Sequence, residues 1–368
     1  MSERMLTVDE ASRTAGEVRG AVPQAREGGG GESQEVAALL DRTREAVEPE
    51  LRKAVDSMPG TMRRIVTYHF GWEHADGRPA AGRGGKAIRP GLVLAAARAL
   101  GGSPAAAVKA AAAVELAHNF TLLHDDVIDR DSTRRHRPTA WTVFGDADAI
   151  LAGDALQALA LRVLADDQHP AAGRAAARLA ACLVELCEGQ HVDTALEDRP
   201  CDQVTLDECL GVAEAKTGAL LGCACALGAL YAGAGVEQVE AMDAFGRQAG
   251  LAFQLIDDII GIWGDPARTG KPVGADLLAG KKSLPVVAAL TSDAAAGAEL
   301  AELYPALRPA DVDRAAAAID RAGGRDWAQT QAADRMSQAV AQLSRAIPDP
   351  EAAGGLLALA EFMTRRVS

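Results

Sequence analysis

Apolar residues recur every three to four positions along almost the whole chain from residue 35 onward. This spacing gives each segment one apolar face and predicts α-helices. The predicted helices span 105–129, 149–165, 171–195, 206–232, 236–263, 285–290, 309–322, 327–347 and 351–366, separated by glycine- and proline-rich breaks at 77–85, 101–104, 198–202, 264–274 and 348–350. No alternating run bounded by turn residues predicts a sheet. We therefore expect an all-α, single-domain helical bundle around a central cavity.

The first 34 residues differ from the rest of the chain. They contain four consecutive glycines at 28–31, scattered charges and few large apolar side chains. Such a segment cannot bury enough surface to fold alone, so we expect residues 1–34 to be a disordered tail before one domain over 35–368. The alternative for the tail is a docking segment for a partner.

Composition and charge exclude several classes of function. Hydrophobic residues make up 48% of the chain but aromatic residues only 4%, which favours helices built from alanine and leucine. The net charge of −13, without a basic block, argues against nucleic-acid binding. No long uncharged apolar run predicts a membrane span, and no signal peptide is recognisable. The six cysteines form no Cys-x-x-Cys pair, which indicates reduced thiols in the cytoplasm rather than a zinc site or a disulfide scaffold.

Two pairs of adjacent aspartates interrupt apolar helical segments. They are Asp125 and Asp126, followed by Asp129, and Asp257 with Asp258. Charges inside an apolar segment are costly unless they are compensated. Asp125 and Asp129 lie one turn apart on the same helical face, so their repulsion favours a hard cation such as Mg²⁺, completed by phosphate oxygens. The alternative for a single pair is a solvated helix face or cap.

Basic residues precede and follow both aspartate pairs. They are Lys86 and Arg89, then Arg134 and Arg135, Lys216, Lys271 and Lys281. Arginine binds phosphate through two parallel hydrogen bonds, whereas lysine acts as a mobile point charge. Each of these residues alone could be an ordinary surface cation. Their order relative to the aspartates indicates a site for diphosphates.

These motifs, in this order, resemble those of the trans-isoprenyl diphosphate synthases, or polyprenyl synthetases. The matching stretches are GGKAIRP at 84–90, ELAH at 115–118, HDDVID at 124–129 with its following arginine pair, KTG at 216–218, FQLIDD at 253–258, TGKPVGADL at 269–277 and GKKSLP at 280–285. The resemblance covers roughly residues 35–368. It implies an isoprenoid-synthase fold, a homodimer, and Mg²⁺-dependent head-to-tail condensation of isopentenyl diphosphate with an allylic diphosphate.

The resemblance also implies roles for individual residues. Asp125, Asp126, Asp129, Asp257 and Asp258 would hold Mg²⁺, three ions in all. Arg134, Lys216 and Lys271 would contact the allylic diphosphate, and Lys86, Arg89, His118, Arg135 and Lys281 the diphosphate of isopentenyl diphosphate. Thr217 and Gln254 would line the cavity near the developing carbocation. The released pyrophosphate is the expected proton acceptor.

The sequence departs from the family pattern at two positions. Gly261 stands where many members carry a third aspartate, so one metal would be bound more weakly or through water. His136 follows the arginine pair where glycine is usual. We expect little effect of His136, since both arginines are retained.

The length of the product is expected to depend on the floor of the cavity. Phe120 and Thr121 lie five and four residues before Asp125, roughly 6–7.5 Å deeper along a helix. In the family, two aromatic residues here tend to stop growth at farnesyl diphosphate, and small residues allow much longer chains. One aromatic residue favours geranylgeranyl diphosphate, with farnesyl diphosphate as the alternative. Phe120 could instead simply pack in the core.

Two other functions fit parts of the pattern. A terpene cyclase would use the same metals on the same scaffold, but it would not need Lys86, Arg89 and Arg135 for a second diphosphate. A non-catalytic subunit that modulates a synthase would be expected to lose aspartates of the first motif, whereas all three are present. The sequence therefore favours the prenyltransferase.

Overall fold

The computed structural model describes residues 29–80, 85–265 and 273–365. The all-α prediction is confirmed, because this part of the chain is almost entirely helical. Its helices are α1 (Gly29–Asp56), α2 (Gly60–Phe70), α3 (Ile88–Ala99), α4 (Val108–Ile128), α5 (Ala140–Phe144), α6 (Asp146–Ala165), α7 (Ala172–Glu197), α8 (Leu206–Ala213), α9 (Ala219–Tyr231), α10 (Val236–Trp263), α12 (Ala275–Leu278), α13 (Leu284–Leu290), α14 (Ala295–Leu303), α15 (Val312–Arg321), α16 (Gly324–Ala346) and α17 (Pro350–Thr364). A π-helix (Glu214–Gly218) joins α8 to α9, and strands β1 (Thr133–Arg134) and β2 (Arg137–Pro138) form one hairpin.

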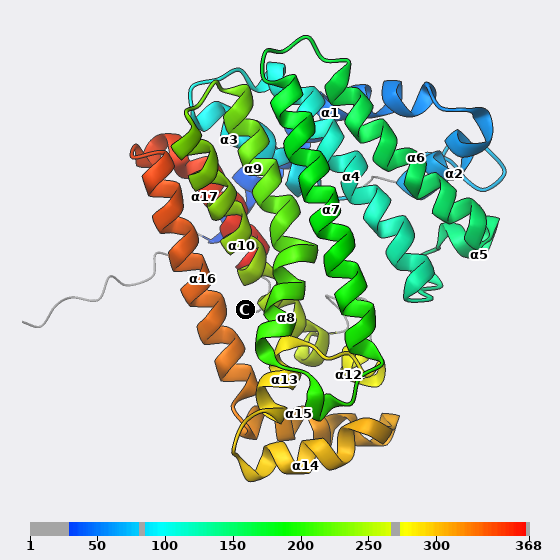
Figure 1. Cartoon of the computed structure of the whole chain (residues 1–368), viewed down its shortest axis with the longest axis vertical. Helices are drawn as coiled ribbons and strands as arrows, with labels where there is room; N and C mark the ends of the chain where they lie inside the picture. Colours follow the sequence, from blue (N-terminus) through cyan, green and yellow to red (C-terminus); the bar gives the residue numbers. More distant parts are fainter. Residues whose placement is uncertain (1–28, 81–84, 266–272, 366–368) are drawn as a thin grey trace, which may run out of the picture.

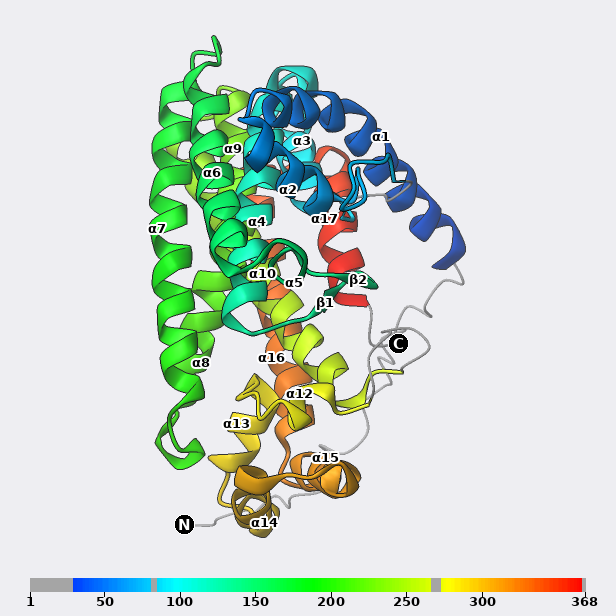
Figure 2. The same cartoon turned by 90° about the vertical axis from the view of Figure 1, so that its right-hand side faces the viewer.

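Long helices set the shape of the molecule. Helices α7, α9, α10 and α16 run side by side along its long axis, while α14 and α15 close its lower end (Figure 1). The view from the side shows α1 and α17 beside α3 (Figure 2), while α2 packs against α5 and α6. One large apolar core unites α3, α4, α6, α7, α9 and α10, with Phe245 among its largest fully buried side chains. Two smaller cores lie beside α13, around Leu255 and Ile319.

Helix α9 is the central helix of the large core. All of its residues are buried, and glycines allow its neighbours to approach closely. A Cβ at Gly228 would lie 2.3 Å from the carbonyl oxygen of Val93 on α3, and one at Gly246 on α10 would lie 2.4 Å from that of Leu221. In the described part of the chain, Leu206–Tyr231 is the one unbent helical stretch long and apolar enough to cross a membrane, and 72% of its most apolar window is buried inside the protein.

The start of the fold differs from the expected boundary. Helix α1 begins at Gly29, so residues 29–34 of the predicted tail are helical. Residues 1–28, and with them the rest of the predicted tail, lie outside the described residues.

The segment after α4 forms a hairpin that the sequence analysis did not predict. Arg134 pairs with Arg137, so Arg135 and His136 form a two-residue turn. Their φ angles are +52° and +61°, which identify a type I′ turn. The search for runs of alternating apolar and polar residues missed this hairpin, because each strand has only two residues. The guanidinium of Arg137 joins the hairpin to the end of α2 by donating to the carbonyl oxygens of Tyr68 and Glu73, both at 3.1 Å.

This turn predicts that His136→Gly stabilises the protein. A left-handed conformation costs a residue with a Cβ roughly 1–2 kcal/mol, and glycine escapes most of that cost. We expect the free energy of unfolding to rise by about 1 kcal/mol, seen in urea as a higher midpoint with an unchanged slope. His136→Ala keeps the Cβ and is the control. An equal gain from alanine would show that backbone strain is not the cause.

Candidate active site

The first aspartate group lies at the C-terminal end of α4, and its members face two directions. Asp126 is buried at 1% exposure and accepts a hydrogen bond at 2.6 Å from Nε of Arg134, on the hairpin. Its other oxygen, Oδ2, is buried without a partner. Asp125 and Asp129 instead lie near Lys216, whose charge favours their ionised forms. Arg134 and Asp126, expected to bind substrate and metal respectively, are thus partners in this structure.

Burial makes the ionised forms of these carboxyl groups less favourable. It raises the pKa of Asp125 to about 6, against the opposing charge of Lys216, and repulsion from Asp129 adds to the rise. It raises the pKa of Asp126 to about 6 as well, against Arg134, and raises that of Asp129. Ionising all three groups is therefore unfavourable until more positive charge arrives.

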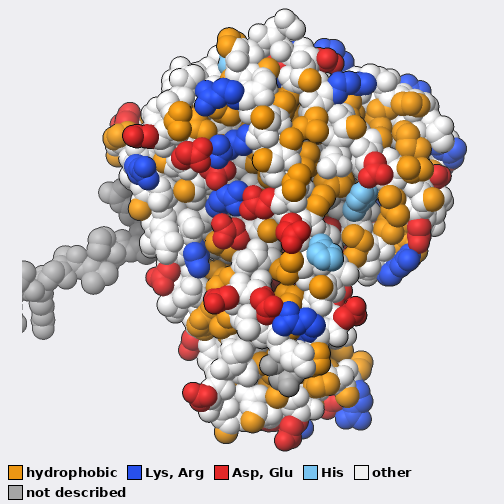
Figure 3. Space-filling view, viewed as in Figure 1, with side chains coloured by type: hydrophobic (Ala, Val, Ile, Leu, Met, Phe, Trp, Pro, Cys, Tyr) orange, Lys and Arg blue, Asp and Glu red, His pale blue; other side chains and the backbone are white. Residues whose placement is uncertain are grey.

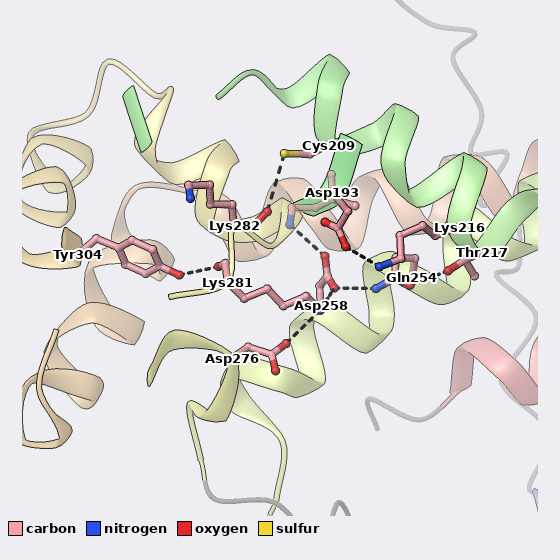
Figure 4. Close-up of polar contacts among 11 residues, drawn as sticks. Asp193, Cys209, Lys216, Thr217, Gln254, Asp258, Asp276, Lys281, Lys282 and Tyr304 are labelled. Carbon is pink, nitrogen blue, oxygen red and sulfur yellow. Dashed lines mark hydrogen bonds and ion pairs between the residues drawn. The ribbon is translucent and has the colours of Figure 1, made fainter. Parts of the chain in front are cut away.

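The second aspartate pair lies near the end of α10 and shows the same division. Asp258 is buried, and its Oδ2 accepts a hydrogen bond at 2.9 Å from the backbone N–H of Leu284, at the start of α13. Its Oδ1 accepts one at 2.8 Å from Nε2 of Gln254 (Figure 4). Asp257 is exposed. Asp258 thus fixes the GKKSLP segment against α10, while Asp257 faces outward.

Asp193 and Lys216 connect the two acidic groups. Lys216 lies on the π-helix and donates to Asp193 on α7, with Nζ 2.5 Å from Oδ2 (Figure 4). The charge of Asp193 raises the pKa of Asp125 and of Asp129, and it also raises that of Lys281, which lies beside Asp258. The acidic ends of α4 and α10 therefore approach one shared region. Such π-helical turns are frequent at functional sites.

A group of cationic side chains lies near His118, about two turns before the aspartates along α4. Nη1 of Arg89 lies 3.2 Å from Nε2 of His118, and Arg135 is close enough to lower the pKa of both. Burial is the main cause that keeps the pKa of His118 well below its usual range, so the ring is neutral and accepts from Arg89 through Nε2. Glu115 is the carboxylate among them, and burial raises its pKa despite Arg89 and Arg135. The Nε of Arg89 is buried without a partner, as expected of a donor that awaits an anion.

The remaining predicted cations are Lys86, Lys281 and Lys271, and they do not all lie with the arginine group. Gly85 packs against Arg135, where a Cβ would lie 2.9 Å from Nη2, so the loop that carries Lys86 reaches the arginine group. Lys281 does not belong to that group. Its Nζ lies 3.5 Å from Asp258 and 3.5 Å from Asp276, beside the second aspartate pair. Lys271 lies outside the described residues.

Thr217 and Gln254 form one fixed polar chain. The hydroxyl of Thr217 donates to Oε1 of Gln254 at 2.9 Å, and the Gln254 amide donates in turn to Asp258. Both hydrogen-bonding ends of the Gln254 amide are therefore occupied, and its orientation is set. The hydroxyl oxygen of Thr217 keeps lone pairs that can face a positive centre.

The two predicted chain-length residues lie one turn before the aspartates. Phe120 is buried at 4% exposure and meets the His124 ring edge to face at 5.0 Å. Thr121 is half-buried, and its hydroxyl donates back to the carbonyl oxygen of His118. Phe120 also belongs to the large apolar core, so packing in the core and limiting a cavity are both compatible with its place.

Two residues of this region were missed as site residues by the sequence analysis. Asp193 lies in a helix whose charges follow an ordinary amphipathic pattern, and Glu115 was noted only as part of a motif. Both become significant only through partners distant in the sequence. Only Glu115 carried a signal in the sequence, because the helical period assigns its carboxylate to a position in the interior.

The donor set fits Mg²⁺ held jointly with phosphate. In the described ranges, no three histidine, cysteine or acidic side chains are close enough to enclose an ion by themselves. Mg²⁺ usually takes only one or two carboxylates and completes its shell with water and phosphate oxygens. Asp125 and Asp129, whose mutual repulsion raises the pKa of Asp125, are carboxylates of this kind, and the buried, unpartnered Oδ2 of Asp126 adds to the local need for positive charge.

Comparison with known proteins places the chain in a family. The family model described as polyprenyl synthetase matches residues 78–322. A geranylgeranyl diphosphate synthase of Mycobacterium tuberculosis is 49% identical over 89% of this chain and 93% of the relative. A (2E,6E)-farnesyl diphosphate synthase of Mycobacterium bovis is 46% identical over 86% and 89%.

The fold agrees with these matches. The crystal structure of a polyprenyl synthetase from Streptomyces coelicolor superposes with a TM-score of 0.85 at 44% identity, over 89% of this chain and 99% of that one. Both the sequence and the helical architecture are therefore shared over nearly all of the described residues. The chain belongs to the polyprenyl synthetase family and is a prenyltransferase, as its motifs predicted.

Proposed function

We propose that the protein joins isopentenyl diphosphate head to tail to an allylic diphosphate and that its main product is geranylgeranyl diphosphate. The observation that carries this proposal is the presence of two cation groups along α4. Lys216 lies with Asp125 and Asp129 at the C-terminal end of the helix, and Arg89, His118 and Arg135 lie about two turns earlier. Two separate cation groups fit two diphosphates, whereas a cyclase binds a single diphosphate and would need only one cation group.

The allylic diphosphate would bind between the acidic ends of α4 and α10. Asp125, Asp129 and Asp257 would hold Mg²⁺, which stabilises the negative charge that grows on the departing pyrophosphate. Lys216 would place its positive charge near the oxygens of the departing pyrophosphate, and Asp193 would hold Lys216 in position. Lys271, which is not among the described residues, would contact the same diphosphate. Asp126 and Asp258, already bonded within the protein, would support the site electrostatically rather than as principal ligands.

The second substrate would bind at the arginine group. Arg89 and Arg135 would grip the diphosphate of isopentenyl diphosphate, with Lys86 from the loop, and His118 would orient Arg89. Fixing both substrates in contact can supply roughly 7–11 kcal/mol of the barrier. Thr217 and Gln254 would present oxygen dipoles to the carbocation, and the apolar walls would exclude water. The released pyrophosphate would accept the final proton.

Exposed apolar side chains support the homodimer that the family resemblance implies. Val184 on α7 is 71% exposed and Leu151 on α6 is 53% exposed, and α6 packs against α7. Hydrophobic side chains are seen among charged ones on the face that carries these two helices (Figure 3). We also propose that the protein acts in the cytoplasm, where buried thiols such as Cys223 and Cys225 stay reduced.

Products identify the function directly. The protein should be incubated with isopentenyl diphosphate, Mg²⁺ and each of dimethylallyl, geranyl and farnesyl diphosphate, and the products measured by mass spectrometry. We expect geranylgeranyl diphosphate from all three starters. Cyclic hydrocarbons from geranyl or farnesyl diphosphate alone would indicate a cyclase instead.

Asp125→Asn should separate catalysis from stability. Turnover should fall by about 10³-fold, since a metal-binding charge is lost. The folded protein, however, holds this carboxyl with its pKa raised to about 6, so the stability gained from its protonation is present at low pH and is lost as pH rises through 6. At pH 7.5 without metal, the neutral amide should therefore raise the free energy of unfolding by about 2 kcal/mol, and by little near pH 4.

Asp293→Asn, at an exposed position in the turn after α13, is the control for that variant. It should change neither turnover nor stability appreciably. Near-normal turnover of Asp125→Asn would exclude the proposed metal site, and an unchanged stability at pH 7.5 would contradict the burial cost.

Phe120→Ala should lengthen the products if Phe120 forms the floor of the cavity. The substitution removes a buried ring, which by itself costs about 3–5 kcal/mol, so folding must be checked by circular dichroism. Leu123→Ala, on the same helix and fully buried, is the matched control for packing loss. Longer products from Phe120→Ala alone are expected. An unchanged product profile in a folded variant would remove Phe120 as the floor.

A further inference from the structure

A guanidinium group joins α7 to α10. Arg247 on α10 donates two parallel hydrogen bonds to Glu185 on α7, from Nη1 at 2.6 Å and from Nη2 at 2.8 Å. Its Nε donates at 2.8 Å to Asp243, one turn earlier on α10, and its Nη1 lies 3.7 Å from Glu214, the first residue of the π-helix. Paired bonds of this kind fix the geometry of an arginine as well as adding energy. The guanidinium of Arg247 is therefore held at one place between the two helices.

A glycine of α9 allows the side chain of Arg247 to reach α7. A Cβ at Gly222 would lie 2.7 Å from Cγ of Arg247 and 2.8 Å from the carbonyl oxygen of Asp243. The stem of Arg247 thus crosses α9 at a position without a side chain. Because the Arg247 side chain is only 23% exposed, water screens its ion pair with Glu185 less than it screens a pair at the open surface.

The π-helix (Glu214–Gly218) is packed closely between the two helices that this bridge joins. On one side, a Cβ at Gly189 of α7 would lie 2.6 Å from Cβ of Ala215. On the other side, a Cβ at Gly250 of α10 would lie 2.8 Å from Cα of Gly218. The separation of α7 and α10 therefore decides how much space the π-helix has.

The same two helices also hold the functional side chains of the π-helix. Asp193 on α7 accepts from Lys216, and Gln254 on α10 accepts from Thr217 (Figure 4). Asp193 lies eight residues after the bridge along α7, and Gln254 lies seven residues after it along α10. These spacings correspond to roughly 12 and 10.5 Å along a helix. The bridge thus joins α7 and α10 about two turns from the contacts that orient Lys216 and Thr217.

We propose that Arg247 is a positioning residue for the part of the site that would bind the allylic diphosphate. By joining α7 to α10, it sets the width of the space in which the π-helix lies. Lys216 and Thr217 are thereby held toward the acidic ends of α4 and α10. Arg247 acts through these two residues, and the proposal rests on the proposed function.

A second bridge between the same two helices provides a matched control. Arg178 on α7 donates to Glu240 on α10, from Nη1 at 2.9 Å and from Nη2 at 3.3 Å, and its Nη2 lies 3.1 Å from Asp243. Arg178 lies seven residues before Glu185, so this bridge is about two turns farther from the π-helix. The two bridges differ in position and resemble each other in chemistry.

Steady-state kinetics of Arg247→Met measure the effect on each substrate separately. Methionine keeps a long stem against Gly222 but forms no ion pair. We expect the KM for geranyl diphosphate to rise by about 10-fold, because Lys216 loses its position, and the KM for isopentenyl diphosphate to stay within about twofold of the parent value. Glu185→Gln keeps the shape of the partner and should raise the KM for geranyl diphosphate by about threefold, which provides a milder variant if Arg247→Met does not fold.

The control variants are Arg178→Met and Glu240→Gln, which should change neither KM by more than about twofold. Circular dichroism should show similar thermal midpoints for Arg178→Met and Arg247→Met. Binding is also measured without turnover, by calorimetry with Mg²⁺ and a thiolo analogue of geranyl diphosphate whose carbon–sulfur bond resists ionisation. Its affinity should fall by about 10-fold in Arg247→Met and stay unchanged in Arg178→Met.

Three results would overturn the inference. The first is a KM for geranyl diphosphate within about twofold of the parent value in folded Arg247→Met and Glu185→Gln. The second is an equal rise of the KM for both substrates. The third is an equal rise in Arg178→Met, because any lost contact between α7 and α10 would then suffice. A parent protein that does not extend geranyl diphosphate would instead contradict the proposed function.

Discussion

The site depends on carboxylates that are held together in a partly dry environment without enough positive charge to balance them. Asp125 and Asp129 share a helix face, Asp193 approaches them from α7, and Lys216 is the cation that lies among them. In water such repulsion would be screened, but burial strengthens it and raises the pKa of Asp125 to about 6. Ionisation of Asp125 therefore opposes folding. The same unbalanced charge is the reason for the proposed binding of Mg²⁺ with a diphosphate.

In each aspartate pair one member is buried and bonded within the protein, and its neighbour is the proposed metal ligand. Asp126 is bonded to Arg134 and ties the hairpin to α4, while Asp258 is bonded to the backbone of Leu284 and ties the start of α13 to α10. Adjacent residues on a helix point about 100° apart, so one member of a pair can face the interior while its neighbour faces the proposed site. A doubled aspartate can therefore combine an anchor within the protein with a proposed metal ligand at one helix end.

Two loops, the hairpin after α4 and the segment after α10, also place charged side chains at the proposed site. Arg134 and Arg135 are presented from a type I′ turn whose strained residues are Arg135 and His136. Asp276 reaches the end of α10 because Gly261 leaves the space. In both places the backbone conformation, rather than the local sequence of charges, decides where a functional group lies.

The sequence alone determined the helical class and the family, and it supplied most of the residues of the proposed site. Helical periodicity is a local property, and Val236–Trp263 was predicted with its observed bounds. Aspartates in apolar segments are recognisable because their cost is local as well. Only the tertiary structure decided which aspartate of each pair is bonded internally, that Asp193 holds Lys216, and that Lys281 lies beside Asp258 and Asp276 instead of the arginines. These facts depend on contacts between residues far apart in the chain, and no pattern within one segment records them.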